Sequence, residues 1–311
     1  MKLNANLYNL TQITQGKLFQ ALRKRQPQVA ERLKTLPPIF QLRGGYAESP
    51  GWFMIQAAEF DPSPLTVSNL RVRDIYASER IVQGLLELLT GERWLAREGD
   101  QYSLTSSGRE IIAQLKRRGA AYLTVEALDW EKEKVERLTR LMGDLIDLSL
   151  NIGPDPNPWS LVHSRNRAPQ ADAPLLQQLS QYFSDFNAYR DDAHMAAWKP
   201  LNIEGYVWEG FALIANGAAT DSRSLYSSLF FRGYSQGEYQ QALDRLTQRG
   251  WLGKNDVQYE LTDAGKAVFE KVEAETDRFF YAPWNLLPPA DMTEAVELLE
   301  ALHAYLDEVI N

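Results

Sequence analysis

The sequence predicts a mainly α protein with small β-hairpins, built as two pseudo-symmetric halves that arose by internal duplication. The first observation is a pair of similar segments, ERWLAREGDQYSLTSSG at 92–108 and RGWLGKNDVQYELTDAG at 249–265. The second is that 78–108 and 235–265 share twelve of thirty-one residues at a constant offset of 157, without a gap. An offset of half the chain is typical of a duplicated structural unit.

Each copy is expected to begin with a helix that a serine caps. Ser78 and Ser235 suit this position, because a serine hydroxyl satisfies a free backbone N–H of the first helical turn. The apolar residues that follow recur at helical spacing, which predicts one buried face on each helix. They are Val82, Leu85, Leu86 and Leu89 in the first copy, and Tyr239, Ala242, Leu243 and Leu246 in the second.

A β-hairpin and a further helix are expected next. Trp94–Leu95 and Gln101–Leu104 alternate as two short strands around the polar tip REGD, and the second copy has GKND in the same place. Thr105 and Thr262 are the expected N-caps of the helices REIIAQLKRR and KAVFEKVEAE. The predicted order in each copy is therefore helix, hairpin, helix.

The domain boundaries follow from the repeat and from a group of prolines. Residues 1–150 are expected to form the first half, with its helix–hairpin–helix unit at about 51–118. Residues 175–311 are expected to form the second half, with its unit at about 205–280. Five prolines within 151–174 predict an extended linker between the halves.

The segment 125–150 is predicted to be one long helix. Leu128, Val135, Leu138, Met142 and Leu145 form an apolar stripe along it. We expect this stripe to pack against an apolar surface, either of its own chain or of a second protomer, so a homodimer is one of two expected arrangements.

Composition and charge fit a soluble globular protein of the cytoplasm. Hydrophobic residues make up 44% and charged residues 24% of the 311, and there is no cysteine. The opening MKLNANLYNLTQ lacks the apolar run of a signal peptide, and no stretch is apolar enough for a membrane helix. The net charge of −8 is uneven, with +6 over 1–118 and −10 over 157–311. The first part of the chain can therefore present a basic face.

Both copies resemble a known family pattern. A helix followed by xxGWLxxxxxxYxLTxxG looks like the recognition helix and wing of winged-helix proteins of the MarR-like kind, so the resemblance implies two winged-helix units. Through LTDAGKAVFEKVEAETDRFFYAPW at 261–284, the second half is also similar to the SCO6745-like helix-turn-helix family. That resemblance implies a fold more than a function. The first copy departs from the pattern at Arg93, where the usual glycine before tryptophan is missing.

We expect no enzymatic activity, no catalytic residues, no cofactor and no metal site. The three histidines, His163, His194 and His303, do not have the spacing of metal ligands, and we interpret them as structural or solvated. The sequence also lacks phosphate-binding glycine loops and the GxSxG motif.

The leading prediction is a transcriptional regulator that binds double-stranded DNA, mainly through its first half. With the apolar face of the first repeated helix turned to the core, Arg80, Gln83 and Glu87 share the opposite face. These side chains are expected to read guanine, adenine and cytosine in that order.

Three further arginines are predicted to support this contact. Arg97 at the hairpin tip is expected to reach a minor groove. Arg71 and Arg73, just before the recognition helix, are expected to contact phosphates.

The alternative is a non-enzymatic scaffold that binds a protein or a ligand and has lost DNA binding. The acidic second half favours it, as do Glu87 and Asp244 at equivalent places in the two recognition helices.

The tryptophans have two interpretations. Trp52, Trp94, Trp208 and Trp251 fall at matching places in the two halves and are expected to be core anchors. A pocket for a small apolar ligand, lined by aromatic residues, is the second interpretation. Its candidate residues are Trp198, Trp208 and Trp284.

Overall fold

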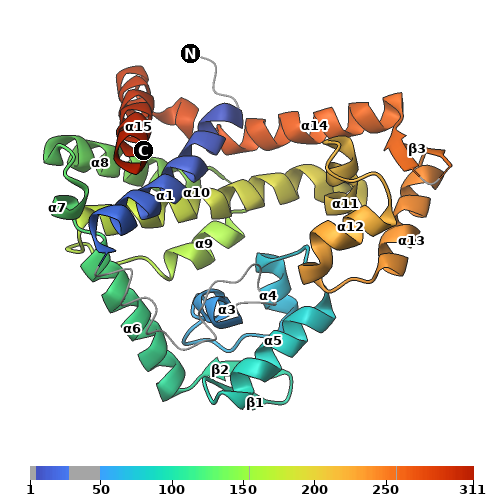
Figure 1. The fold of residues 1–311 in the computed structure, drawn as a ribbon, viewed down its shortest axis with the longest axis horizontal. Coiled ribbons are helices and arrows are strands. Elements are labelled where there is room, and N and C mark those ends of the chain that lie inside the picture. Colours follow the sequence, from blue (N-terminus) through green and yellow to red (C-terminus); the bar gives the residue numbers. More distant parts are fainter. Residues whose placement is uncertain (1–4, 28–49, 154, 257) are drawn as a thin grey trace. The chain divides into compact units, whose positions relative to one another are not determined.

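The computed structural model describes residues 5–27, 50–153, 155–256 and 258–311 (Figure 1). Within these ranges the chain is mainly helical, with two antiparallel two-stranded hairpins. The predicted fold class, mainly α with small β-hairpins, is therefore confirmed. No described helix has both the length and the apolar composition that crossing a membrane requires.

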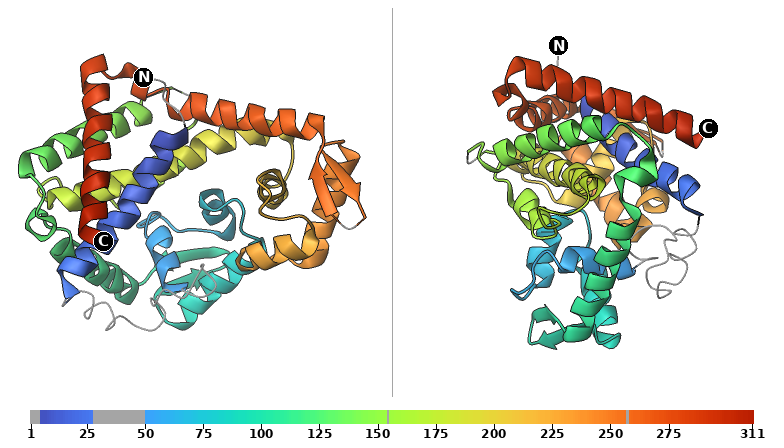
Figure 2. Two further views of the ribbon diagram at one scale, coloured as in Figure 1. Left: turned by 45° about the horizontal axis from the view of Figure 1, so that its top comes forward. Right: turned by 90° about the vertical axis from the view of Figure 1, so that its left-hand side faces the viewer.

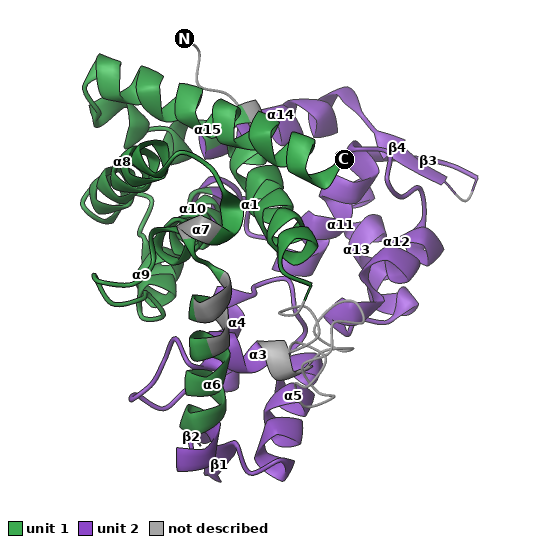
Figure 3. Cartoon of the chain, turned by 60° about the vertical axis from the view of Figure 1, so that its left-hand side comes forward, with its two compact units in different colours: residues 1–41, 109–193, 277–311 green, residues 42–108, 194–276 purple. Residues whose placement is uncertain are grey.

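The chain folds into two compact units, which Figure 3 distinguishes by colour. Unit 1 takes residues 1–41, 109–193 and 277–311, and unit 2 takes 42–108 and 194–276. Each unit thus combines segments from both halves of the sequence, because apolar faces far apart in the chain share one core.

Unit 1 consists of helices around one apolar core. It contains α1 (Ala5–Arg25), α7 (Val125–Leu128), α8 (Lys132–Leu150), α9 (Trp159–Arg165), η4 (Trp284–Leu286) and α15 (Pro289–Ile310). It also takes most of α6 (Ser106–Tyr122), most of α10 (Leu175–Trp198) and the end of α14 (Asp263–Phe280). Within this unit α1 and α15 lie side by side (Figure 2).

Two expectations about unit 1 need correction. The segment 125–150 is not one helix, because Asp129 has a φ of 60° and separates α7 from α8. The expected linker 151–174 is not extended throughout, because it contains α9.

The expected packing of the apolar stripe is confirmed. Leu128, Val135, Leu138, Met142 and Leu145 are completely buried in the core of unit 1. That core also holds side chains of α1, α10 and α15. The stripe packs within its own chain and so is not available to a second protomer.

Unit 2 contains both repeated segments. The first segment forms α3 (Pro50–Ala57), α4 (Val67–Arg73), α5 (Glu79–Gly91), β1 (Leu95–Glu98) and β2 (Gln101–Leu104), and α6 follows. The second forms η2 (Lys199–Leu201), α11 (Gly205–Ala215), α12 (Ser222–Leu229), η3 (Phe230–Arg232), α13 (Gln236–Gln248), β3 (Leu252–Asn255) and β4 (Gln258–Leu261), and α14 follows.

The two hairpins have the same register. Leu95 pairs with Leu104 in the first, and Leu252 pairs with Leu261 in the second, a shift of 157 residues. The expected order of helix, hairpin and helix is present in both segments.

The turn before each hairpin adopts the same backbone conformation despite the sequence difference at Arg93. Arg93 has a φ of 62°, and Gly250 at the matching position has a φ of 74°. An arginine therefore occupies a left-handed conformation that usually favours glycine. The absent glycine does not change the geometry of this turn.

The repeated glycine after each hairpin is required by a close approach. An added Cβ on Gly108 would lie 2.2 Å from the carbonyl oxygen of Trp94, and one on Gly265 would lie 2.0 Å from that of Trp251. The N–H groups of these two glycines donate to the hydroxyls of Thr105 and Thr262, both at 3.0 Å. The predicted threonine N-caps are thus present in both copies.

Candidate nucleic-acid interface

The two candidate recognition helices, α5 and α13, begin in the same way. The Ser78 hydroxyl accepts from the N–H of Ile81, and the Ser235 hydroxyl accepts from the N–H of Glu238. The predicted apolar face of each helix is buried. The polar residues on the other faces are therefore the candidates for contact with a partner.

A three-residue clasp ties α5 to the second strand of its hairpin. The Gln83 side-chain amide donates to a carboxylate oxygen of Glu87 at 2.6 Å and to the hydroxyl oxygen of Tyr102 at 2.8 Å. These two partners use the N–H donors of the Gln83 amide. Bidentate recognition of adenine would also need an N–H donor from this amide. Gln83 therefore has a structural role in this arrangement.

The same clasp recurs in the second segment. The Gln240 side-chain amide donates to Asp244 at 2.9 Å and to the hydroxyl of Tyr259 at 2.7 Å. The Tyr259 hydroxyl in turn donates to Asp244 at 3.1 Å. The joining of helix and hairpin thus explains why both copies have this glutamine, this tyrosine and an acidic residue at equivalent positions.

A cation lies over the tyrosine of each clasp. The guanidinium carbon of Arg97 is 5.6 Å from the ring centroid of Tyr102, and the ammonium of Lys254 is 5.2 Å from that of Tyr259. Arg97 also has one guanidinium nitrogen 3.6 Å from Glu87, and its side chain is 47% exposed. Arg97 is therefore accessible, but it lies within β1 opposite Tyr102 and not at the tip of the hairpin, where the sequence analysis placed it.

The two arginines before α5 differ in accessibility. The Arg73 side chain is only 7% exposed and donates to the fully buried Glu59 at 3.1 Å. Such a guanidinium is not available to a phosphate, so Arg73 is not one of the phosphate contacts that the sequence predicted. The Arg71 side chain is 33% exposed, and its Nε donates to the carbonyl oxygen of Ala77 at 3.1 Å.

The N-terminus of α5 lies against the turn that precedes α13. The Ser78 N–H donates to the carbonyl oxygen of Arg232 at 2.8 Å. Arg80, 67% exposed, donates to the carbonyl oxygen of Gly233 and lies 3.4 Å from a carboxylate oxygen of Glu238. Arg80 is thus exposed, as its predicted role requires, but it already has an acidic neighbour.

Arg232 reinforces this junction. Its guanidinium donates to both carboxylate oxygens of Asp74, at 2.9 and 3.1 Å, and to Glu209, at 2.7 Å for the shortest bond. Burial raises the pKa of Asp74 and of Glu209, while the positive charge of Arg232 acts in the opposite direction. Arg232 therefore pairs with two acids, the buried Asp74 at the end of α4 and the partly buried Glu209 of α11.

The sequence analysis missed this junction. Asp74, Glu209 and Arg232 all lie outside the stretch of high identity that defined the repeat. A charged residue on an otherwise apolar helix, Glu209 in YVWEGFALIA, was the one local signal of a buried ion pair.

The tryptophans proposed for a ligand pocket are core residues of two different units. Trp198 and Trp208 stack at 6.4 Å in the core of unit 2, and Trp284 lies in the core of unit 1. Each is 1% exposed.

Two of the other expected anchors can also be placed. Trp94 is buried like Trp208, whereas Trp251 is only partly buried. The side chain of Trp52 lies outside the described part of the structure.

The histidines have protein partners in the described residues. His194 accepts from the indole N–H of Trp208 at 2.8 Å, His163 stacks on Trp159, and His303 lies 3.0 Å from the Thr14 hydroxyl. Among the described side chains, no group of three or more histidine and acidic residues is arranged to hold a metal ion.

Comparison with known proteins supports the helix-turn-helix interpretation of the second half. Residues 160–309 match the sequence model of a helix-turn-helix family, a range that includes α11 to α14 and the β3–β4 hairpin. This part of the chain is thus of the helix-turn-helix class. No curated protein and no solved structure shows significant similarity to the chain.

Proposed function

We propose that this protein is a non-enzymatic transcriptional regulator that binds double-stranded DNA, mainly through its first half. The observation that carries the proposal is the helix-turn-helix match over residues 160–309. The first segment has the same order of elements and the same hairpin register as that matched region. In this interpretation both segments are MarR-like winged-helix units from one duplication, with α5 as a recognition helix and β1–β2 as its wing.

The charge distribution along the sequence favours the first half as the DNA-contacting one, although residues 50–104 by themselves carry five basic and eight acidic residues. Residues 1–118 have a net charge of +6, whereas 157–311 have −10. Phosphates attract positive charge and repel negative charge. The exposed Arg80 and Arg97 are the principal contacts, Arg71 is a weaker candidate, and Gln83 supports the helix through its clasp.

Titration of the purified protein with bulk duplex DNA tests this proposal. Binding at low salt should weaken steeply at moderate salt, because contacts to phosphates release counterions. An absence of duplex binding at both salt concentrations, in the wild type and in the Arg232→Ala variant described below, would contradict it.

A scaffold that no longer binds DNA is the second candidate, and the junction at Ser78 favours it. Helix-turn-helix proteins usually contact bases with the N-terminal residues of the recognition helix. Here the N-terminus of α5 packs against Arg232 and Gly233. A base edge could not approach that end of the helix without displacing this turn.

Breaking the junction separates the two candidates. Arg232→Ala removes the guanidinium that holds Asp74 and Glu209. If the folded variant binds duplex DNA and the wild type does not, the protein is a DNA-binding protein in a closed form. If neither binds at low salt, the scaffold is the better description.

A further inference from the structure

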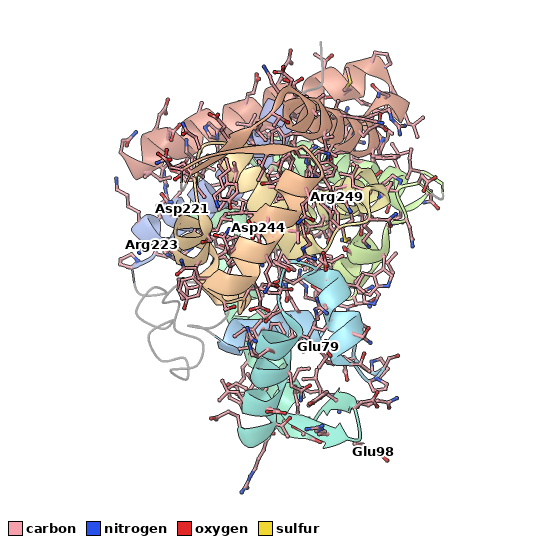
Figure 4. All side chains as sticks on the ribbon, turned by 90° about the vertical axis from the view of Figure 1, so that its right-hand side faces the viewer. Glu79, Glu98, Asp221, Arg223, Asp244 and Arg249 are labelled. Carbon is pink, nitrogen blue, oxygen red and sulfur yellow. The ribbon has the colours of Figure 1, made fainter. Side chains whose placement is uncertain are left out.

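A cationic groove lies beside α13, on the part of the helix that leads into β3. Its volume is about 470 Å³. Lys199 of η2 and Arg245 and Arg249 at the end of α13 provide its positive charges, and Glu204 is its one acidic residue. Arg249 lies at the end of α13, whereas Asp244 lies farther back along the same helix (Figure 4).

The positive charge of this groove is unusual for its part of the chain. Three cations and one carboxylate give it a formal charge of +2, within a segment, 157–311, whose net charge is −10. At the offset of 157, the positions of Arg245 and Arg249 correspond to Leu88 and Glu92 in the first copy. The cationic pair is therefore a feature of the second copy alone and is not needed for the shared fold.

Protein contacts hold the guanidinium group of Arg249 in place. Arg249 donates to the carbonyl oxygens of Leu201 and Asn202, at 2.8 and 2.9 Å. Asn202 has a φ of 52°, a left-handed conformation that asparagine tolerates better than most residues. Each terminal nitrogen of Arg249 has two hydrogens, so donors remain for a ligand.

The other two cations leave room for an anion, although Arg245 also donates to the hydroxyl of Tyr206. Arg245 pairs with Glu204 at 3.0 Å, with side chains 44% and 59% exposed, and an ion pair this exposed contributes little free energy. An incoming anion can therefore share Arg245 with Glu204 at low cost. Within the described residues, the exposed ammonium of Lys199 makes no hydrogen bond and no ion pair.

Part of the lining of the groove is apolar. Ile203, Val207 and Leu246 contribute to it, and of these Ile203 is partly exposed, whereas Val207 and Leu246 are buried. Ligand sites typically combine such apolar walls with a few fixed polar groups, in volumes of about 300 to 1,000 Å³. We propose that this groove binds a small organic anion, with its carboxylate or phosphate at Lys199 and Arg249 and its apolar body against Ile203.

Matched small probes test this site on the full chain. Binding of phenylacetate, phenyl phosphate and uncharged 2-phenylethanol is measured by saturation-transfer NMR at constant ionic strength. At least one of the two anions should bind, and whichever binds more tightly identifies the head group, while 2-phenylethanol should not bind measurably. Binding of the alcohol as tight as that of both anions would overturn the proposal.

Variants then locate the site. Lys199→Gln should weaken binding of the better anion about tenfold, the loss expected for a hydrogen bond between charged groups. Because its ammonium has no described partner, this change should leave the melting temperature unaltered. Lys254→Gln, which removes an exposed cation on β3 outside the groove, is the matched control and should leave affinity unchanged. Equal losses in the two variants, or no loss in either, would show that the anion does not bind in this groove.

Discussion

The backbone N–H of Ser78 donates to the carbonyl oxygen of Arg232, which joins the N-cap of α5 to the turn before α13. A helix N-terminus needs partners for its free N–H groups, and here one partner comes from the other repeated segment. The two repeated segments of unit 2 are thereby connected at the places where α5 and α13 begin.

Gly233→Ala should destabilise the protein more than an ordinary left-handed glycine substitution. Gly233 has a φ of 80°, and an added Cβ would lie 2.4 Å from the Ser78 hydroxyl oxygen and 2.8 Å from Ile81 Cβ. Gly217 is the control, because its φ is 69° but nothing lies within 4 Å of an added Cβ. Urea unfolding should show a loss of about 1 to 2 kcal/mol for Gly217→Ala. The loss should be about 1 to 3 kcal/mol larger for Gly233→Ala. Equal losses would mean that the junction adapts to the added methyl group without a further loss of unfolding free energy.

The clasp should appear as an energetic coupling between Gln83 and Tyr102. In a double-mutant cycle of Gln83→Ala and Tyr102→Phe, we expect a coupling of about 0.5 to 1.5 kcal/mol in the free energy of unfolding. The cycle of Gln240→Ala and Tyr259→Phe should give a similar value, because the amide-to-hydroxyl distances are 2.8 and 2.7 Å. If neither cycle shows a coupling, the clasp does not contribute to the stability of the protein.

Arg73→Ala should act on stability. Its partner Glu59 is fully buried, so the variant leaves an acid without this guanidinium and should lose about 3 to 5 kcal/mol of unfolding free energy. Arg97→Ala is the comparison, because the Arg97–Glu87 pair is half exposed and should contribute less than about 1 kcal/mol. Denaturant curves of the two variants check this order, and a reversal would argue against the burial of Arg73.

If the first segment contacts DNA, three substitutions should differ in their effects. Arg80→Ala should cost about 1 to 3 kcal/mol of binding free energy and relax sequence preference, because a base contact is lost. Arg71→Ala should weaken binding to all sequences about equally, as expected for a phosphate contact. Lys254→Ala, in the acidic second half, should have little effect.

Gel-shift titrations against several duplexes measure these losses, and melting temperatures show whether each variant is folded. Equal losses from Arg80→Ala and Lys254→Ala would remove the assignment of DNA contact to the first segment.

The junction should also make stability depend on pH through Asp74. Burial raises the pKa of its carboxyl group in the folded protein, so the native state binds this proton more tightly than the unfolded chain does. That contribution to stability is complete below the unfolded value of about 3.9 and is lost as pH rises through the native pKa.

The comparison of wild type with Asp74→Asn isolates this effect. The wild-type advantage in unfolding free energy should decrease as pH rises, because the variant lacks the titrating group. Glu209→Gln should show the same sign, since burial also raises the pKa of Glu209. An advantage that grows with pH would mean that the attraction to Arg232 exceeds the cost of burial.

The sequence by itself determined the local structure of the repeated segments. The serine and threonine caps, the buried faces of α5 and α13 and both hairpins were predictable, because each depends on residues within a few positions of one another. The exposed position of Arg80 followed from the same helical periodicity.

The tertiary structure alone decided which segments share a core and which polar groups are already engaged. Gln83 and Arg73 have the spacing of DNA-contacting residues, but one holds Tyr102 and the other is buried on Glu59. Arg232 meets Asp74 across 158 positions of sequence. Periodicity shows which face of an element is buried but not which distant face covers it, because that choice depends on the shape and charge of surfaces that only the folded chain brings together.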